Sequence, residues 1–150
     1  MKHLTFLIFT VILFSCQDDD SNINFDKQNE TEILNYISTN NLSAQKTASG
    51  LYYVIDNPGQ GTQPNSNSTV RVSYKGYFTD GDVFDQSNAS GISFGLQQVI
   101  QGWTEGIQLF KEGGSGKLLI PSRLGYGPKD NRSIPGGSVL IFDITLLEVQ

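Results

Sequence analysis

The sequence predicts an α+β fold, in which an antiparallel sheet of about five strands is wrapped across one short helix and follows another short helix near the N-terminus. Several segments alternate apolar and polar residues with the period of two that is typical of half-buried strands. One segment between them, 102–111, instead spaces its large apolar residues at helical intervals. The 16 glycines indicate many tight turns between these elements.

Residues 1–15 come first and are typical of a lipoprotein signal peptide. Lys2 provides a positive charge, and the apolar stretch behind it is too short to span a bilayer core about 30 Å thick. Residues 13–16 resemble the bacterial lipobox, which makes Cys16 the predicted lipidation site. The acidic run at 18–20 resembles an export tag of surface lipoproteins. We therefore expect a protein anchored by lipid to a membrane of the bacterial cell envelope, at the outer membrane, facing either the periplasm or the cell surface.

Residues 16–28 are rich in Asp and Asn and have too little apolar surface to offset the entropy lost on ordering. They are predicted to be a flexible tether. Residues 29–46 are predicted to contain a short helix, because Ile33 and Ile37 recur at helical spacing before two consecutive asparagines that stop it. We expect this helix to pack on the domain that follows, with a partner-binding helix as the alternative.

Residues 47–150 are predicted to form the folded domain. Alternation along 70–78 points Tyr74 inward, and Asp80-Gly81 predicts a turn that returns the chain toward Phe84. Near the C-terminus, alternation makes Phe142 face the core as well. Further strands are expected at 51–56 and 117–121.

The helix predicted within 102–111 carries Trp103, Ile107 and Phe110 on one stripe and ends at Gly113-Gly114. Trp103 is the only tryptophan of the chain, and its large aromatic face at the start of a helix can form the floor of a cavity.

Composition excludes several classes of chemistry. The single His and single Cys are His3 and Cys16, so a domain that begins later has no Cys-His or Ser-His nucleophile and no His or Cys metal ligand. The Asp and Glu residues form no metal-binding motif, and we expect neither a metal nor a cofactor. A net charge of −5 argues against nucleic acid as a partner.

Short motifs in a fixed order give the strongest indication of function. They lie at 72–76, 80–85, 99–103, 124–127, 134–135 and 139–143. Together they resemble the FKBP-type peptidyl-prolyl cis-trans isomerases, and the resemblance extends over about residues 47–149.

The resemblance also implies roles for individual residues. Asp85, Tyr126 and Phe84 would be catalytic: Asp85 as the acid near the twisting amide, and Tyr126 as a hydroxyl that hydrogen-bonds a substrate carbonyl. Residues implied to bind substrate are Tyr74, Phe94, Val99, Ile100, Trp103, Ile134 and Phe142. Trp103 would lie under the proline ring and Ile134 on an overhanging loop. The alternative for each aromatic residue is ordinary core packing.

An aromatic cavity can accelerate this reaction without a nucleophile. Amide resonance holds the X-Pro bond planar behind a barrier of about 18 to 20 kcal/mol. The twisted transition state loses that resonance and its charge separation, so an apolar cavity destabilises the planar state more. The resemblance therefore implies a monomeric isomerase acting on proline-containing polypeptides of the envelope, with macrolides as inhibitors.

The sequence departs from the family pattern after Asp85 and at 128–133, where other residues replace the usual loop sequence. No Arg or Lys lies between Asp85 and Trp103, so the basic partner common in the family is missing and Tyr74 alone is left to orient Asp85. Phe84 and Asp85 are adjacent and both expected to face the cavity, which requires a β-bulge. Two other functions stay open: a peptide-binding module or chaperone without turnover, and an accessory subunit of a surface complex.

Overall fold

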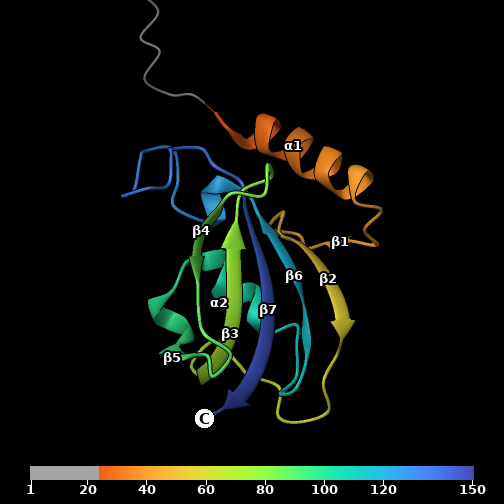
Figure 1. Cartoon of the computed structure of the whole chain (residues 1–150), viewed down its shortest axis with the longest axis vertical. Coiled ribbons are helices and arrows are strands. Elements are labelled where there is room, and N and C mark those ends of the chain that lie inside the picture. The colour runs from red at the N-terminus through yellow and green to blue at the C-terminus, as the bar shows by residue number, and fades with distance from the viewer. Residues whose placement is uncertain (1–23) are drawn as a thin grey trace, which may run out of the picture.

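A computed structural model describes residues 24–150, and the predictions for the signal peptide, for Cys16 and for most of the tether fall outside these residues. Seven strands form one antiparallel sheet in the order β1-β2-β6-β7-β3-β4, with β5 also pairing with β3 (Figure 1). The strands are β1 (Gln45–Lys46), β2 (Tyr52–Asn57), β3 (Thr69–Tyr77), β4 (Val83–Gln86), β5 (Ile92–Gly95), β6 (Ser115–Ile120) and β7 (Leu140–Val149).

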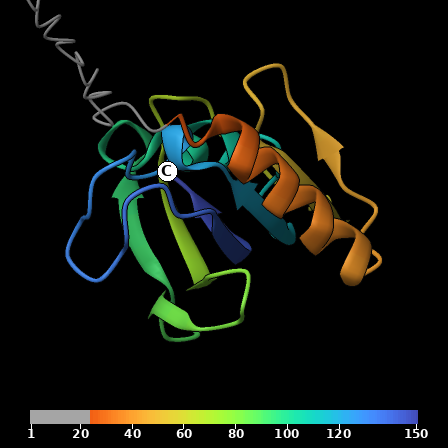
Figure 2. The ribbon, with the colours of Figure 1, turned by 90° about the horizontal axis from the view of Figure 1, so that it is seen from above.

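Two α-helices cover opposite faces of this sheet. They are α1 (Asp26–Thr39) and α2 (Gln101–Ile107), and the short 3-10 segments η1 (Leu96–Gln98) and η2 (Ser122–Leu124) complete the structure of residues 24–150. On β6, Leu118 and Ile120 pack with the α2 side chains, whereas the intervening Leu119 packs with Ile33 of α1. Figure 2 shows α1 lying obliquely over the sheet. The predicted α+β architecture is confirmed.

The strand prediction was incomplete at two short segments. The predicted strands correspond to β2, β3, β4, β6 and β7, whereas β1 and β5 were missed. They contain 2 and 4 residues, which is too short for alternation to be distinguished from a loop. The helix predicted within 102–111 ends earlier, at Ile107, and Phe110 is buried from the turn that follows it.

The N-terminal boundaries also need correction. Helix α1 begins at Asp26, so the last part of the predicted tether is helical, and it ends at Thr39, so the predicted helical segment also contains a turn and β1. In the first turn, the Asn24 side chain accepts a 3.0 Å hydrogen bond from the Asp26 N–H, and the Phe25 carbonyl accepts the Asn29 N–H at 2.7 Å. Asn41 ends the turn with φ +53°, a left-handed conformation that Asn tolerates.

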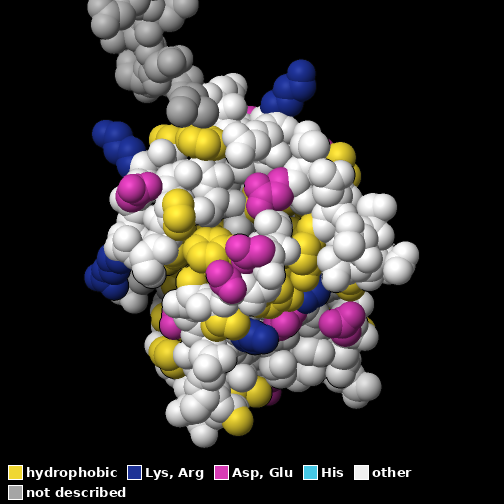
Figure 3. Space-filling view, turned by 45° about the horizontal axis from the view of Figure 1, so that its top comes forward, with side chains coloured by type: hydrophobic (Ala, Val, Ile, Leu, Met, Phe, Trp, Pro, Cys, Tyr) yellow, Lys and Arg dark blue, Asp and Glu magenta, His cyan; other side chains and the backbone are white. Residues whose placement is uncertain are grey.

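Helix α1 packs on the domain through one stripe. Ile33 is fully buried with Tyr52, Leu119 and Val139, whereas Leu34 on the outer side is 47% exposed. In the part of the chain that the structure describes, no helix is both long and apolar enough to cross a membrane. On the face in Figure 3, charged side chains of both signs are spread around a group of hydrophobic side chains.

Helix α2 lies very close to the sheet because two of its residues are glycines. A Cβ atom at Gly102 would lie 2.6 Å from the Ile120 side chain, and one at Gly106 would lie 2.5 Å from the Leu118 side chain. Any other residue would therefore push the helix away from β6. The first turn of this closely packed helix carries Trp103, which is 5% exposed.

Candidate functional site

One cavity of about 770 Å³ contains every site residue that the sequence analysis named, apart from Cys16. It lies between the β3–β4 hairpin, the segment leading into α2, and the loop between η2 and β7. Those residues are Tyr74, Phe84, Asp85, Phe94, Val99, Ile100, Trp103, Tyr126, Ile134 and Phe142.

Aromatic rings pack edge to face around Trp103 at the base of the cavity. Its ring centroid lies 4.9 Å from Tyr74 and 5.1 Å from Phe142, with interplanar angles of 86° and 80°. Phe94 approaches from β5 at 5.1 Å, with its ring tilted by 50°. These contacts fix the ring orientations and leave an aromatic surface toward the cavity.

The Trp103 indole N–H is buried and has no hydrogen-bond partner within residues 24–150. An unpaired buried donor costs about 1 to 3 kcal/mol and is rare outside functional sites.

Phe84 reaches the cavity through the β-bulge that the sequence required. Gly76 pairs with Asp85 but Tyr77 pairs with Val83, so Phe84 is the extra residue in β4. The Phe84 ring packs edge to face on Phe142 at 5.4 Å. Gly76 makes room for both rings, because a Cβ there would lie 2.7 Å from each of them.

Asp85 is held by Tyr74. The Tyr74 hydroxyl donates a 2.7 Å hydrogen bond to the Asp85 carboxylate. Burial raises the pKa of Tyr74, and the hydrogen bond to Asp85 raises it further, so this phenol remains a donor throughout the neutral range. The predicted orientation of Asp85 by Tyr74 is therefore present in the structure.

The rim of the cavity is formed by the loop between η2 and β7, residues 125–139, which we call the rim loop. Tyr126 is 41% exposed, which leaves its hydroxyl available to a bound molecule. Ile134 is buried at the end of a tight turn, in which it exchanges two backbone hydrogen bonds with Asn131, of 2.9 and 3.0 Å. Arg132 lies within this turn, with φ +54°.

Sequence reasoning missed part of the lining: Ile92, Gln98, Asn131, Arg132 and Ser133. Ile92 belongs to the missed strand β5. Asn131 to Ser133 lie where the sequence departs from the family pattern, so no motif pointed to them. The cation at the rim is thus Arg132, in the loop before β7, and not a residue between Asp85 and Trp103, where the family commonly has one.

The cavity has an apolar aromatic floor, and its polar groups include the Asp85 carboxylate, the exposed Tyr126 phenol and the Arg132 guanidinium. Within residues 24–150, no three His, Cys, Asp or Glu side chains lie close enough together to hold a metal ion. The residues present are suited to burying a compact apolar ring, while polar groups at the rim contact the chain on either side of it.

Comparisons with known proteins agree with this geometry. Residues 60–147 match the family described as FKBP-type peptidyl-prolyl cis-trans isomerase. The isomerase FkpA of Aeromonas hydrophila is 44% identical over 108 residues, which are 71% of this chain and 40% of the relative. FkpA of Escherichia coli strain K12 is 46% identical over 108 residues, or 70% of this chain and 40% of the relative.

Two solved structures are also similar. A peptidyl-prolyl cis-trans isomerase from Pseudomonas syringae has a TM-score of 0.73 and 30% identity, and the match covers 87% of this chain and 98% of that one. FkpA from Escherichia coli has a TM-score of 0.71 and 35% identity, covering 84% and 62%. This chain spans about two fifths of the length of the curated relatives it matches. It belongs to the family of FKBP-type peptidyl-prolyl cis-trans isomerases.

Proposed function

We propose that this protein is a peptidyl-prolyl cis-trans isomerase that binds proline-containing polypeptides in the aromatic cavity. The observation that carries the proposal is the packing of Tyr74, Phe94 and Phe142 against Trp103, which gives the cavity an apolar aromatic floor. Family membership supports the same activity.

The cavity would accelerate rotation by desolvation. A planar X-Pro amide carries a resonance dipole, which the rings of Trp103 and Phe142 solvate less well than water does. The twisted amide has lost that dipole, so moving it into the cavity costs less. The difference between these two costs lowers the barrier and requires no covalent step.

Tyr126 and Asp85 supply the polar part of the mechanism. The exposed Tyr126 hydroxyl would donate to a carbonyl of the bound peptide and fix the peptide while the bond turns. Asp85, held by Tyr74, would lie near the twisting amide and set the electrostatic potential on that side of the bound peptide. Both groups act on the same proline only because the β-bulge and the rim loop face each other across one cavity.

A cis-to-trans exchange assay without a coupling protease tests the proposal. The full chain in detergent should accelerate exchange of an X-Pro peptide above the uncatalysed rate, whereas Phe142→Ala should lose acceleration because it opens the aromatic base. Binding is measured separately from the fluorescence of Trp103, with a proline peptide or a macrolide as the probe. Saturable binding without any acceleration would favour the alternative, a peptide-binding module or chaperone, over an isomerase.

We also propose that the protein acts at the bacterial cell envelope, where a lipid on Cys16 anchors it to a membrane. The support is the sequence alone: a charged start, a short apolar stretch and a cysteine followed by acidic residues. Its clients would then be exported or envelope polypeptides.

The anchor gives a direct prediction. Cys16→Ser removes the acylation site, so the variant should move from the membrane fraction to the soluble fraction when cells are lysed. Acyl chains provide the binding energy, and stable anchoring needs more than one of them. Ser15→Ala, next to the cysteine, serves as the matched control and should stay in the membrane fraction. Retention of Cys16→Ser in that fraction would show that the lipid is not the anchor.

A further inference from the structure

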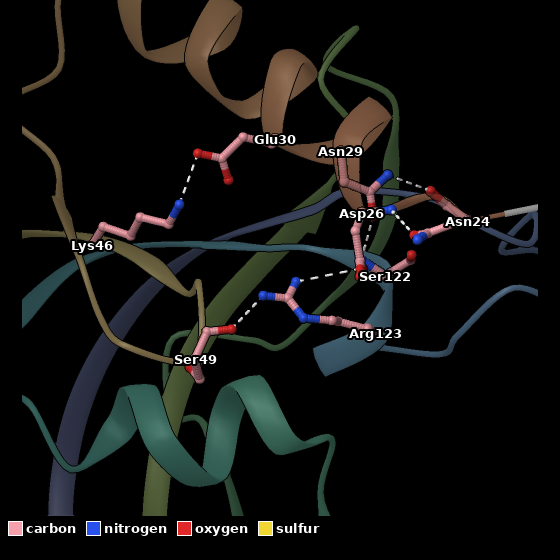
Figure 4. Close-up of polar contacts among 9 residues, drawn as sticks. Asn24, Asp26, Asn29, Glu30, Lys46, Ser49, Ser122 and Arg123 are labelled. Atoms are coloured by element: carbon pink, nitrogen blue, oxygen red, sulfur yellow. Dashed lines mark hydrogen bonds and ion pairs between the residues drawn. The ribbon is translucent and has the colours of Figure 1, made fainter.

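Asn29 in the first turn of α1 is fully buried, although its side chain is polar and the family match begins only at residue 60. Its amide nitrogen donates a 2.8 Å hydrogen bond to the Gly137 carbonyl, and its amide oxygen accepts a 2.7 Å hydrogen bond from the Ser122 N–H. Figure 4 shows Asn29 next to Ser122, with Asp26 and Arg123 beside them. The two backbone groups that it joins lie at the two ends of the rim loop.

These contacts continue directly to Tyr126. The Ser122 carbonyl accepts hydrogen bonds from the N–H groups of Gly125 and Gly127, at 2.9 and 2.8 Å, on either side of Tyr126. At the other end, the Gly137 N–H donates to the Gly127 carbonyl at 2.9 Å. The backbone around Tyr126 is therefore held by Ser122 and Gly137, which Asn29 holds in turn.

Phe25, which precedes α1, and Asp26, its first residue, contact the same two ends of the loop. The Phe25 ring lies against Gly137, where a Cβ atom would be only 2.3 Å from it. Asp26 forms a 3.6 Å ion pair with Arg123 of η2, and Arg123 also donates to the Ser49 carbonyl. The start of α1 thus fixes both ends of the rim loop. Ile33, further along α1, packs on the opposite sheet face with Tyr52, Leu119 and Val139, and Val139 is the last residue of the loop before β7.

We propose that Asn29 is a positioning residue, which holds the rim loop so that Tyr126 and Ile134 stay over the aromatic base. The proposal rests on the proposed isomerase function for its catalytic consequence, but the loop itself can be observed without any turnover. On this basis α1 is part of the functional unit, and the helix that follows the tether sets the shape of the cavity rim.

Asn29→Asp is the sharpest test. Ionised Asp keeps the acceptor for the Ser122 N–H but turns a negative oxygen toward the Gly137 carbonyl, whereas protonated Asp can donate to that carbonyl again. Burial raises the pKa of such a carboxyl, so the donor returns on mild acidification. The variant should lose about three- to tenfold in kcat/KM at pH 8 and recover most of it by pH 5. Asn29→Ala should show the loss without the recovery.

The charged groups around this position are Asp26 and Glu30 of α1, Arg123 of η2, and Asp130 of the rim loop, whose carboxylate accepts the Gly136 N–H at 2.8 Å beside Gly137. All of them are also present in the wild type. The ratio of variant to wild type at each pH therefore isolates the new carboxyl. Ile33→Ala is the matched control, because it weakens the packing of α1 on Tyr52, Leu119 and Val139 but leaves the hydrogen bonds of Asn29 to Ser122 and Gly137 in place. It should lower the midpoint of urea unfolding and leave kcat/KM of the folded protein unchanged.

Amide hydrogen exchange reports the order of the rim loop independently of isomerase activity. Exchange at Gly125, Gly127 and Gly137 should accelerate in Asn29→Ala and stay slow in Ile33→Ala. If exchange accelerates in Asn29→Ala but the wild type does not catalyse X-Pro exchange, the positioning role is supported and the isomerase function is rejected. Unchanged exchange at these glycines, or an equal loss of kcat/KM in Ile33→Ala, would overturn the proposal. If the Asn29 variants do not fold, Phe25→Leu, which loosens only the Gly137 end, should accelerate exchange at Gly137, and unchanged exchange there would count equally against it.

Discussion

Tyr126 differs from the other aromatic residues of the cavity because it is 41% exposed at the rim, whereas Trp103 and Phe142 are buried. Removing the hydroxyl oxygen of Tyr126 removes one hydrogen bond and little packing. A neutral hydrogen bond contributes about 0.5 to 1.5 kcal/mol, which corresponds to a loss of a few-fold to about tenfold in rate. In the proposed mechanism, Tyr126 therefore orients the peptide, while the aromatic floor of the cavity provides the apolar environment.

Tyr126→Phe should reduce kcat/KM for an X-Pro peptide by a few-fold to about tenfold, without a measurable change in the free energy of unfolding. The exchange assay and urea unfolding check the two parts. Tyr53→Phe is the matched control, because its hydroxyl bonds Gln45 at 3.0 Å outside the cavity. A loss of several hundredfold in Tyr126→Phe would point to a chemical role for the hydroxyl, and no loss would remove Tyr126 from the mechanism.

Most site residues could be located from the sequence because they lie in short motifs whose neighbours fix their direction, whereas Phe94 lies outside these motifs and was named from the family resemblance. Strand alternation points Tyr74 and Phe142 inward, and the adjacency of Phe84 and Asp85 requires the bulge that β4 contains. Arg132 could not be predicted in the same way. Its place at the rim depends on a left-handed turn in an irregular loop, and no periodicity governs such loops.

At the scale of elements, helix α1 shows where prediction from pattern stops. Its apolar stripe was visible in the sequence, but its first turn is polar and resembles the tether before it. Phe25 and Asn29 fold that turn through contacts with Gly137, more than a hundred residues away in the chain. Such a contact has no local signal, so a pattern confined to neighbouring residues places the boundary too late.

Helix α2 provides the prediction at this scale. Gly106→Ala gains about 1 kcal/mol of helix propensity, but the new methyl group meets the fully buried Leu118, and overpacking of this kind costs about 1 to 3 kcal/mol. We expect a net loss of up to about 2 kcal/mol in the free energy of unfolding, together with weaker peptide binding, because the displaced helix carries Trp103.

Urea unfolding and Trp103 fluorescence titration measure the two effects of Gly106→Ala. Gly95→Ala is the control, since a Cβ there meets nothing nearer than 3.6 Å. Stability equal to or above that of the wild type would show that α2 can move away from β6 without harm.

At the scale of the whole molecule, one polar cluster joins α1 to the middle of the sheet. The Tyr77 hydroxyl on β3 donates to Asp143 on β7 at 3.1 Å, and Lys117 on β6 contacts both. Tyr36 of α1 reaches Tyr77 at 3.5 Å. Burial is the main cause that raises the pKa of Tyr36 to about 12, with the contact to Tyr77 adding to it, and burial likewise raises the pKa of Tyr77 to about 12.

These shifts predict alkaline instability with a definite sign. In the unfolded chain a tyrosine ionises near pH 10, whereas Tyr36 and Tyr77 keep their protons to about pH 12 in the folded protein. Their contribution to stability is therefore complete below pH 10 and is lost as the pH rises to 12, because the unfolded chain releases protons that the folded protein retains. Lysines also titrate in this range, so the wild type alone does not isolate the phenols.

Tyr36→Phe separates the titration of Tyr36 from that of the lysines. The variant lacks the hydroxyl of Tyr36 but keeps every lysine, so the stability of the wild type relative to the variant should fall steadily between pH 10 and 12 and stay constant from pH 7 to 9. Urea unfolding followed by far-ultraviolet circular dichroism measures it, since tyrosinate does not disturb that signal as it disturbs fluorescence. Parallel curves for the two proteins up to pH 12 would mean that Tyr36 titrates as a free phenol and that α1 does not bury it against Tyr77.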